Sequence, residues 1–132
     1  MKRIELTEQF IAKMSPQDRK MLGVTSNSDH RLADYLRNER QAQNMFARWL
    51  TINEIYFIQP RADIRSTVRI GHPDFSIFHK GKTLFIEMKA EGGTLSESQI
   101  ECAETLRQRG FTVQVCYSAL EAIEATREFF SI

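Results

Sequence analysis

The first half of the chain carries hydrophobic residues at helical spacing. Short helical patterns lie within residues 1–27, and a longer helix is predicted from about Asp29 to Leu50, with Asp29 as its N-cap. Residues 1–27 are therefore expected to form a peripheral N-terminal arm. Residues 28–132 are expected to form the main domain, which is long enough to close a single core.

Two polar residues interrupt the apolar stripe of the long helix. At about 100° per residue, six positions fall within about 80° of arc. They are Leu32, Leu36, Glu39, Gln43, Phe46 and Leu50. A buried carboxylate is costly unless it is paired, hydrogen-bonded or bound to a cation, so Glu39 is a candidate functional residue. The alternative is a capped or partly exposed glutamate at the helix edge.

Short apolar runs bounded by turn residues predict strands in the second half. The predicted strands cover residues 52–60, 74–78, 83–89 and 111–117. A helix is predicted to begin near residues 94–96, because Thr94 with Glu97 and Ser96 with Gln99 both fit a capping box. A last helix is predicted to begin after Ser118. The order helix, three strands, helix, strand, helix predicts an α/β fold with a small mixed sheet flanked by helices.

Charged residues stand inside two of the predicted strands. If Lys80-Gly81 forms a two-residue turn, Asp74 lies directly opposite Glu87 in the antiparallel pair. The Cβ atoms of such a pair are about 4.5–5.5 Å apart, and like charges there are destabilising unless a positive group lies between them. Carboxylate oxygens suit Mg²⁺ or Mn²⁺, and Lys89 projects from the same face as Glu87. The hairpin therefore predicts a divalent metal site of the kind that supports phosphodiester hydrolysis.

Two alternatives stay open for this charged face. Asp74 and Glu87 could each pair with a neighbouring Lys or Arg on a solvent-facing side. A three-residue bulged turn could also shift the register by one residue and separate the two carboxylates. In either case the opposite strand face, which consists of Leu84, Ile86 and Met88, is apolar and is expected to be buried.

The order and spacing of these residues resemble a known signature. Gly71-x-Pro73-Asp74, twelve further residues and Glu87-Met88-Lys89 resemble the PD-(D/E)XK nuclease signature, in its VRR-NUC branch. In that family a helical glutamate precedes the hairpin, and a glutamine follows it in a segment like Leu95-Ser96-x-x-Gln99. The resemblance covers roughly residues 35–125 and implies a restriction-endonuclease-like core, so that residues 28–132 would be the nuclease domain.

The resemblance also implies a role for individual residues. The implied catalytic residues are Glu39, Asp74, Glu87, Lys89 and Gln99, and the implied metal ligands are Asp74, Glu87, Glu39 and the main-chain carbonyl of Met88. Glu54 is a rival for the role of Glu39, but it lies in a strand or loop. Gln99 has a second interpretation, because a capping box would occupy its side chain at the helix start.

Charge is distributed unevenly along the chain. Residues 61–89 contain six Lys and Arg against three Asp and Glu, whereas residues 90–132 contain three against seven. A net charge of +1 does not itself indicate a nucleic-acid partner, but basic residues near the motif could contact phosphates. The predicted DNA contacts are Arg61, Arg65, Arg69 and His72, although a loop histidine can equally be a surface residue.

The resemblance implies a metal-dependent DNA endonuclease that uses Mg²⁺ or Mn²⁺, acts on branched or junction DNA and forms a homodimer. The alternative is a non-catalytic domain of the same fold that binds DNA or a protein. No run of about 18 apolar residues predicts a membrane span. Cys102 and Cys116 lack metal-type spacing and are predicted to be buried thiols. The expected location is the cytoplasm of a bacterial cell or a phage-infected host.

Overall fold

The described part of the computed structural model, residues 39–60 and 70–132, has the predicted order of helices and strands. The elements are α4 (Glu39–Ile52), β1 (Tyr56–Ile58), β2 (Phe75–His79), β3 (Lys82–Met88), α5 (Glu97–Gln108), β4 (Thr112–Cys116) and α6 (Ala119–Phe130). Within these ranges the strands form one sheet in the order β1-β2-β3-β4. β1, β2 and β3 are antiparallel neighbours, and β4 is parallel to β3. The predicted α/β fold with a small mixed sheet is confirmed, and the arm predicted for residues 1–27 lies outside the described residues.

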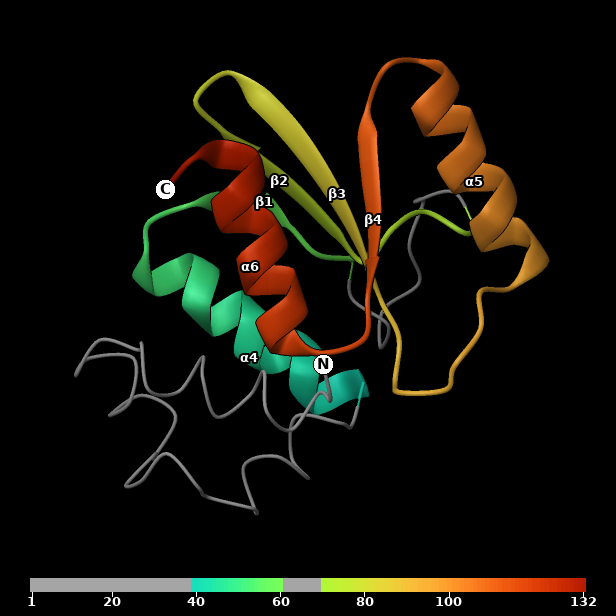
Figure 1. Cartoon of the computed structure of the whole chain (residues 1–132), viewed down its shortest axis with the longest axis horizontal. Helices are drawn as coiled ribbons and strands as arrows, with labels where there is room; N and C mark the ends of the chain where they lie inside the picture. The colour runs from blue at the N-terminus through green and yellow to red at the C-terminus, as the bar shows by residue number, and fades with distance from the viewer. Residues whose placement is uncertain (1–38, 61–69) are drawn as a thin grey trace.

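Helices cover both faces of this sheet (Figure 1). The side chains of β3 alternate between the two faces, as expected for a strand. Leu84, Ile86 and Met88 join the main core with residues of α4 and α6, as predicted. Phe85 points the other way and packs with Ala103 of α5. The core therefore lies mainly between the sheet and the α4–α6 pair, and a smaller cluster lies under α5.

Helix α4 presents a slightly different stripe from the predicted one. Its buried residues are Ala42, Met45, Phe46, Trp49 and Leu50. Glu39 and Gln43 are half-buried at the flank of this stripe, which corrects their predicted place near its middle. The Oε1 atom of Gln43 accepts a hydrogen bond of 3.3 Å from Nε2 of Gln59, so this amide has a polar partner. Residues 29–38 of the predicted helix lie outside the described residues.

The strand predicted over residues 52–60 is shorter in the structure, because α4 extends to Ile52 and a turn follows. Glu54 adopts a left-handed backbone with φ of 55°, and the Ile55 amide donates to the Leu50 carbonyl at 3.0 Å. A left-handed residue followed by such a bond is a common way to end a helix. Glu54 is consequently an exposed residue of the helix end, and β1 is limited to Tyr56–Ile58.

The β2–β3 hairpin has the predicted two-residue turn. Lys80 and Gly81 have φ values of 50° and 73°, as a type I′ turn requires, and His79 pairs with Lys82. The ladder continues to the pair of Phe75 with Ile86, which is the predicted register. The bulged alternative is therefore wrong. The predicted strand, residues 74–78, included Asp74. In the structure Asp74 lies one residue before β2.

The prediction of two buried thiols agrees with the structure. Cys102 and Cys116 are free and buried. Burial, with a smaller contribution from the charge of Glu121, raises the pKa of the Cys116 thiol to about 12. Among the helices of the described residues, none is long and apolar enough to cross a membrane.

Candidate active site

Asp74 and Glu87 meet where β2 begins and β3 ends. The ladder pairs Phe75 with Ile86, so the next position brings Asp74 beside Glu87. The Oδ2 atom of Asp74 accepts a hydrogen bond of 2.8 Å from the main-chain amide of Met88. This bond fixes the Asp74 carboxylate to the end of β3. The two-residue turn and the strand register thus hold two acidic groups together at one point of the sheet.

Glu87 is a buried acidic residue, with a relative exposure of only 4%. Desolvation, the charge of Asp74 and a side-chain hydrogen bond to Asp74 raise its pKa from 4.5 to about 8, and Glu39 adds a smaller effect in the same direction. The positive charge of Lys89 acts in the opposite direction. A carboxyl group that resists ionisation because of burial and like charge is stabilised in its ionised form by a nearby cation.

Gln99 of α5 connects the helix start to Glu87. Ser96 is the N-cap of α5, and its main-chain amide donates to Oε1 of Gln99 at 2.8 Å. The Nε2 atom of the same amide donates to Oε1 of Glu87 at 3.0 Å. Because a main-chain N–H can only donate, the cap fixes which end of the Gln99 amide faces Glu87. The two interpretations of Gln99 are therefore compatible, and Ser96, not Thr94, is the cap.

Lys89 follows β3 directly and stands on the same side as Glu87. Its main-chain amide donates to the Cys116 carbonyl at 2.9 Å, which continues the parallel pairing of β3 with β4 by one residue. Its side chain is half-buried, and its charge lowers the pKa of Glu87. The structure therefore brings a lysine ammonium within electrostatic reach of the carboxylate pair.

The two rivals for the helical acid lie at opposite ends of α4. Glu39 is at its start and is close enough to raise the pKa of Glu87. Glu54 follows its last turn, about 20 Å away along the helix axis at 1.5 Å per residue. The described residues contain no group of three or more His, Cys, Asp and Glu side chains that could hold a metal ion together. Glu39 consequently does not complete a three-carboxylate cluster with Asp74 and Glu87.

The donors at this point nevertheless fit a hard divalent cation. Asp74 and Glu87 supply carboxylate oxygens, and Met88 lies between Glu87 and Lys89 with its side chain buried in the core. Only its main chain is therefore available to a ligand. Two carboxylates, a main-chain oxygen and solvent oxygens are the donor types that Mg²⁺ and Mn²⁺ accept. These donors would fill only part of the coordination sphere of such an ion and would leave the other coordination positions to water or substrate.

His72 belongs to the Gly71-x-Pro73-Asp74 motif, and its side chain packs beside Ser76 and Phe85. It donates or accepts through Nε2 at 3.1 Å from Oγ of Ser76, and its ring meets Phe85 edge-on at 5.7 Å. Burial lowers its pKa. Ser76 was not predicted to contribute, although it lies two residues after Asp74 and therefore on the same side of the chain. The other predicted DNA contacts, Arg61, Arg65 and Arg69, lie outside the described residues.

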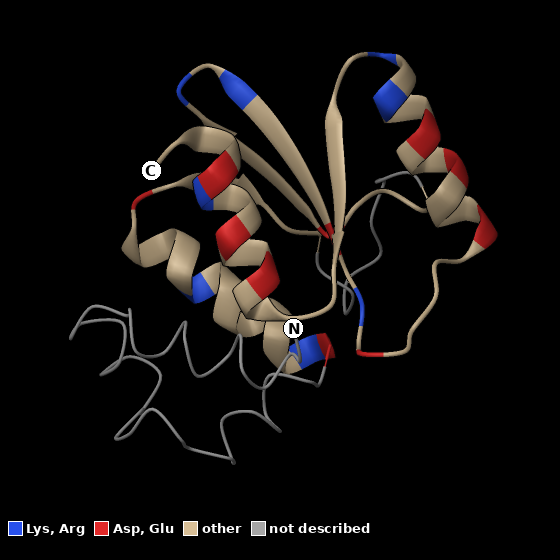
Figure 2. Cartoon of the chain, viewed as in Figure 1, with Lys and Arg blue, Asp and Glu red and all other residues tan. Residues whose placement is uncertain are grey.

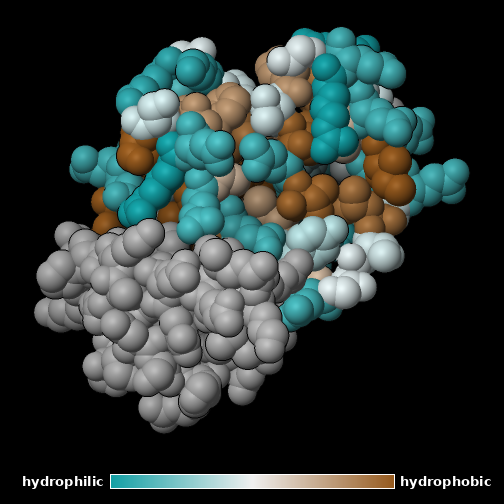
Figure 3. Space-filling view, in the orientation of Figure 1, coloured by the Kyte–Doolittle hydropathy of each residue, from teal (hydrophilic) through white to brown (hydrophobic). Residues whose placement is uncertain are grey.

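Charge on the outer surfaces restricts where a polyanion can approach. Acidic residues follow the exposed side of α5 and α6, which Figure 2 shows as red bands. They include Glu97, Glu101 and Glu104 on α5, and Glu124 and Glu128 on α6. In the space-filling view, hydrophilic residues cover the outer side of α5 and the hairpin tip, with apolar residues between them (Figure 3). Phosphates are repelled from the acidic helix surfaces, so DNA would reach the carboxylate pair from another side.

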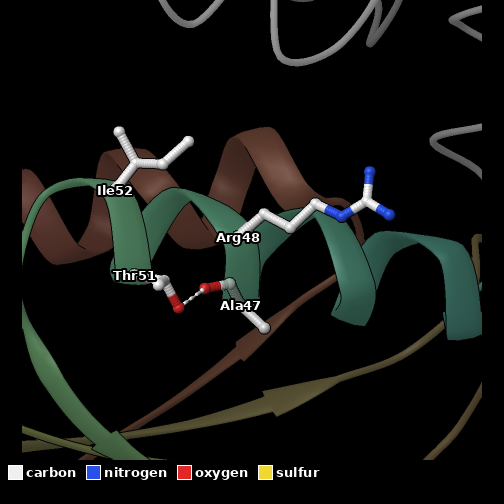
Figure 4. A pocket seen from close by; sticks show the side chains of 4 residues that line it. All are labelled: Ala47, Arg48, Thr51 and Ile52. Atoms are coloured by element: carbon white, nitrogen blue, oxygen red, sulfur yellow. Dashed lines mark hydrogen bonds between the residues drawn. The ribbon is translucent and has the colours of Figure 1, made fainter.

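A pocket elsewhere on the molecule does not coincide with these residues. It has a volume of about 420 Å³ and is lined by Ala47, Arg48, Thr51 and Ile52 on the second half of α4 (Figure 4). The Thr51 hydroxyl donates to the Ala47 carbonyl at 2.9 Å, which leaves it occupied within the helix. None of its described lining residues is a carboxylate, and they lie away from Glu39 along α4, so this pocket is not the candidate active site.

The comparisons with known proteins identify the family. The family model described as the VRR-NUC domain matches residues 31–120, which is more than half of the 132-residue chain and includes Glu39, Asp74, Glu87, Lys89 and Gln99. Neither the comparison with curated proteins nor the comparison with solved structures gives a match. With the mixed sheet, the motif order and this match together, the chain belongs to the VRR-NUC family of PD-(D/E)XK-like nuclease domains.

Proposed function

We propose that this domain is a DNA endonuclease that requires Mg²⁺ or Mn²⁺. The observation that carries the proposal is the buried Glu87 carboxyl held against Asp74, with its pKa raised to about 8. A pair of acidic groups arranged in this way is unfavourable by itself and becomes favourable with a cation. The family match supports a nuclease-type domain, and the donor types support the metal requirement.

In this proposal Asp74, Glu87 and the main-chain carbonyl of Met88 would hold the ion. The negative charge of Glu39 would attract the ion from a greater distance. The ion, when bound, would lower the pKa of a water molecule and neutralise charge on the phosphate. Lys89 orients the attacking water through a hydrogen bond and stabilises the negative charge that develops on the phosphate oxygens. The water oxygen bonds to phosphorus and loses a proton to solvent, while the bond from phosphorus to one bridging oxygen breaks and the leaving sugar oxygen takes a proton from solvent.

Gln99 has the role of holding Glu87 in this proposal. Its Nε2 atom donates to one oxygen of Glu87, and the side-chain contact of Glu87 with Asp74 would be replaced by contacts with the ion. The capping contact with Ser96 prevents the amide from rotating. Basic residues bind the substrate phosphates in this proposal, and Arg61, Arg65 and Arg69 stay predictions for this role. His72, which belongs to the Gly71-x-Pro73-Asp74 motif, stays a predicted DNA contact as well.

A homodimer is also part of the proposal, because a small domain offers little surface to a branched DNA substrate. The β1–β2 part of the sheet exposes apolar side chains on the face opposite α4 and α6. Tyr56 pairs across the strands with Phe78 at a ring distance of 5.9 Å, and the two are 68% and 37% exposed. Ile58, which is 49% exposed, continues this strip. An apolar strip of this kind supports association of two copies.

Cleavage assays with matched variants test the proposal. The wild-type protein is expected to cut four-way junction, flap or duplex DNA with Mg²⁺ or Mn²⁺, and to stop in EDTA. Asp74→Asn and Lys89→Ala are each expected to lower the rate by at least about 100-fold. Glu104→Gln, which removes an exposed carboxylate on α5, serves as the control. Cutting that survives both active-site changes rules out this site, and DNA binding without any cutting favours the non-catalytic alternative.

A further inference from the structure

Gly71 lies at the start of the Gly71-x-Pro73-Asp74 loop and touches the first turn of α5. Its backbone has a φ of +87°, a region that side chains other than glycine rarely adopt. A Cβ atom at this position would overlap the main-chain oxygen of Ser98. It would also lie 2.5 Å from the Ser98 carbonyl carbon and 3.0 Å from the Gln99 amide nitrogen. The loop and the helix thus meet backbone to backbone.

This contact is next to the residue that holds Glu87. Carbon atoms that are not bonded normally stay about 3.5–4.0 Å apart, so a Cβ at Gly71 would move the loop and α5 apart by about 1 Å. The bond from Gln99 to Glu87 is 3.0 Å long and cannot survive an added separation of that size. The same movement pulls on Asp74, which is three residues along the loop and bonded to Met88.

We propose that Gly71 is a positioning residue of the candidate active site. Its missing side chain lets the motif loop dock on the α5 backbone, and this contact places the Gln99 amide on Glu87 while Asp74 is held on β3. The inference rests on the proposed function for its effect on cleavage, but the placement of Gln99 is a property of the protein without metal or DNA. A shift of about 1 Å at such a site lowers rates by up to about 100-fold.

Gly110 provides a matched control at the other end of α5. Its φ is +89°, nearly the value at Gly71, but a Cβ there would meet nothing within 4 Å. Alanine at either position therefore carries the same cost of a left-handed backbone. Only alanine at Gly71 also pushes the loop from the helix. The difference between the two variants measures the close contact alone.

The first test uses metal-free protein and no substrate. In ¹H–¹⁵N NMR spectra, the side-chain amide signals of Gln99 are identified by their loss in Gln99→Ala. We expect Gly71→Ala to shift these signals toward those of a solvent-exposed glutamine, and Gly110→Ala to leave them in place. Unchanged Gln99 signals in folded Gly71→Ala would overturn the proposal. This result does not depend on whether the protein cuts DNA.

The second test is a double-mutant comparison of single-turnover cleavage. Gly71→Ala is expected to lower the rate about 10- to 100-fold, and Gly110→Ala to leave it within about twofold. In the Gln99→Ala background, Gly71→Ala should cost clearly less than it does in the wild type, because its route of action through Gln99 is already lost. Fully multiplicative losses would overturn the proposal, since Gly71 would then act independently of Gln99. If the wild-type protein does not cut DNA, the proposed function is contradicted, but the placement of Gln99 by Gly71 is still tested by the NMR comparison.

Asparagine variants cover the case in which alanine disrupts folding. Asn tolerates positive φ better than alanine does but still carries a Cβ atom, so Gly71→Asn and Gly110→Asn repeat the comparison with less backbone strain. If both Gly71 variants fail to fold while both Gly110 variants fold, the contact is required for the whole fold. The proposal of a role specific to the active site is then wrong.

Discussion

Replacement of Glu87 by glutamine separates the charge of this side chain from its shape. The amide oxygen introduced by Glu87→Gln would still accept the hydrogen bond from Gln99, and the new NH₂ group could donate to Asp74. What the change removes is a negative charge that is buried beside another carboxylate. We therefore expect Glu87→Gln to be more stable than the wild type in EDTA at alkaline pH, in contrast to most substitutions of a buried residue.

The sign and size of this effect follow from the raised pKa. The pKa of Glu87 is about 8 in the folded protein against an ordinary value of 4.5, so the folded state binds more protons between these values. Wild-type stability consequently falls as pH rises from 4.5 to about 8. At about 1.4 kcal/mol per pH unit the upper limit is roughly 5 kcal/mol, and structural relaxation and water penetration around the ionised carboxylate reduce it to roughly 2–3 kcal/mol.

Divalent cations should cancel this advantage of the variant. A ligand at 100 times its dissociation constant stabilises the folded state by about 2.7 kcal/mol. Mn²⁺ should add stability of this size to the wild type, because Glu87 ionises on binding, and much less to Glu87→Gln. Glu87→Gln should therefore have a larger free energy of unfolding than the wild type in EDTA at pH 8.5. The two free energies should be about equal at pH 5, and also at pH 8.5 in saturating Mn²⁺.

Urea unfolding followed by circular dichroism measures these differences. The free energy of unfolding is determined at pH 5 and pH 8.5, with EDTA or with MnCl₂, for the wild type, Glu87→Gln and the exposed control Glu104→Gln. The control should change by less than about 0.5 kcal/mol under every condition. A variant that is less stable than the wild type at pH 8.5 in EDTA, or a gap that does not depend on pH, would refute the reasoning.

Three further predictions concern other parts of the molecule. Gln99→Glu replaces the amide that donates to Glu87 by a third carboxylate, so it should lower cleavage at least about tenfold in a rate assay at pH 7, and an unchanged rate would exclude this role of Gln99. Tyr56→Lys combined with Phe78→Lys should halve the mass found by light scattering, and an unchanged mass would exclude this strip as the dimer contact. Cys116, buried and with its pKa raised to about 12, should react with a thiol reagent at pH 8 only after unfolding; fast reaction of the native protein would contradict its burial.

Local patterns in the sequence were sufficient to predict the hairpin and its register. A two-residue turn with glycine at a left-handed position leaves one pairing, and that pairing puts every second residue of β3 on the core side. The same register brings Asp74 beside Glu87. The two carboxylates could therefore be predicted as neighbours without any knowledge of the tertiary structure.

The end of α4 could not be predicted in this way. A left-handed residue that ends a helix is usually glycine, and here it is Glu54. Only Asn53 and Glu54 separate the apolar residues of the helix end from those of β1, and neither is glycine or proline, so no strong helix breaker marks the boundary at Ile52. The buried stripe of α4 was also predicted at the wrong angle around the helix. Met45 and Trp49 belong to it in the structure, and they move its centre away from Gln43.

The contacts that turn two neighbouring acids into a candidate active site are long-range ones, and sequence patterns describe them poorly. Capping rules explain one hydrogen bond of Gln99, but its bond to Glu87 joins α5 to β3 and depends on how closely the helix approaches the sheet. That approach depends in turn on the backbone contact at Gly71, where a turn alone would explain the glycine. The acidic pair is thus specified by strand register, whereas the orientation of the Glu87 carboxylate also depends on the packing of α5. Changes that loosen α5 should therefore weaken the site while the hairpin stays intact.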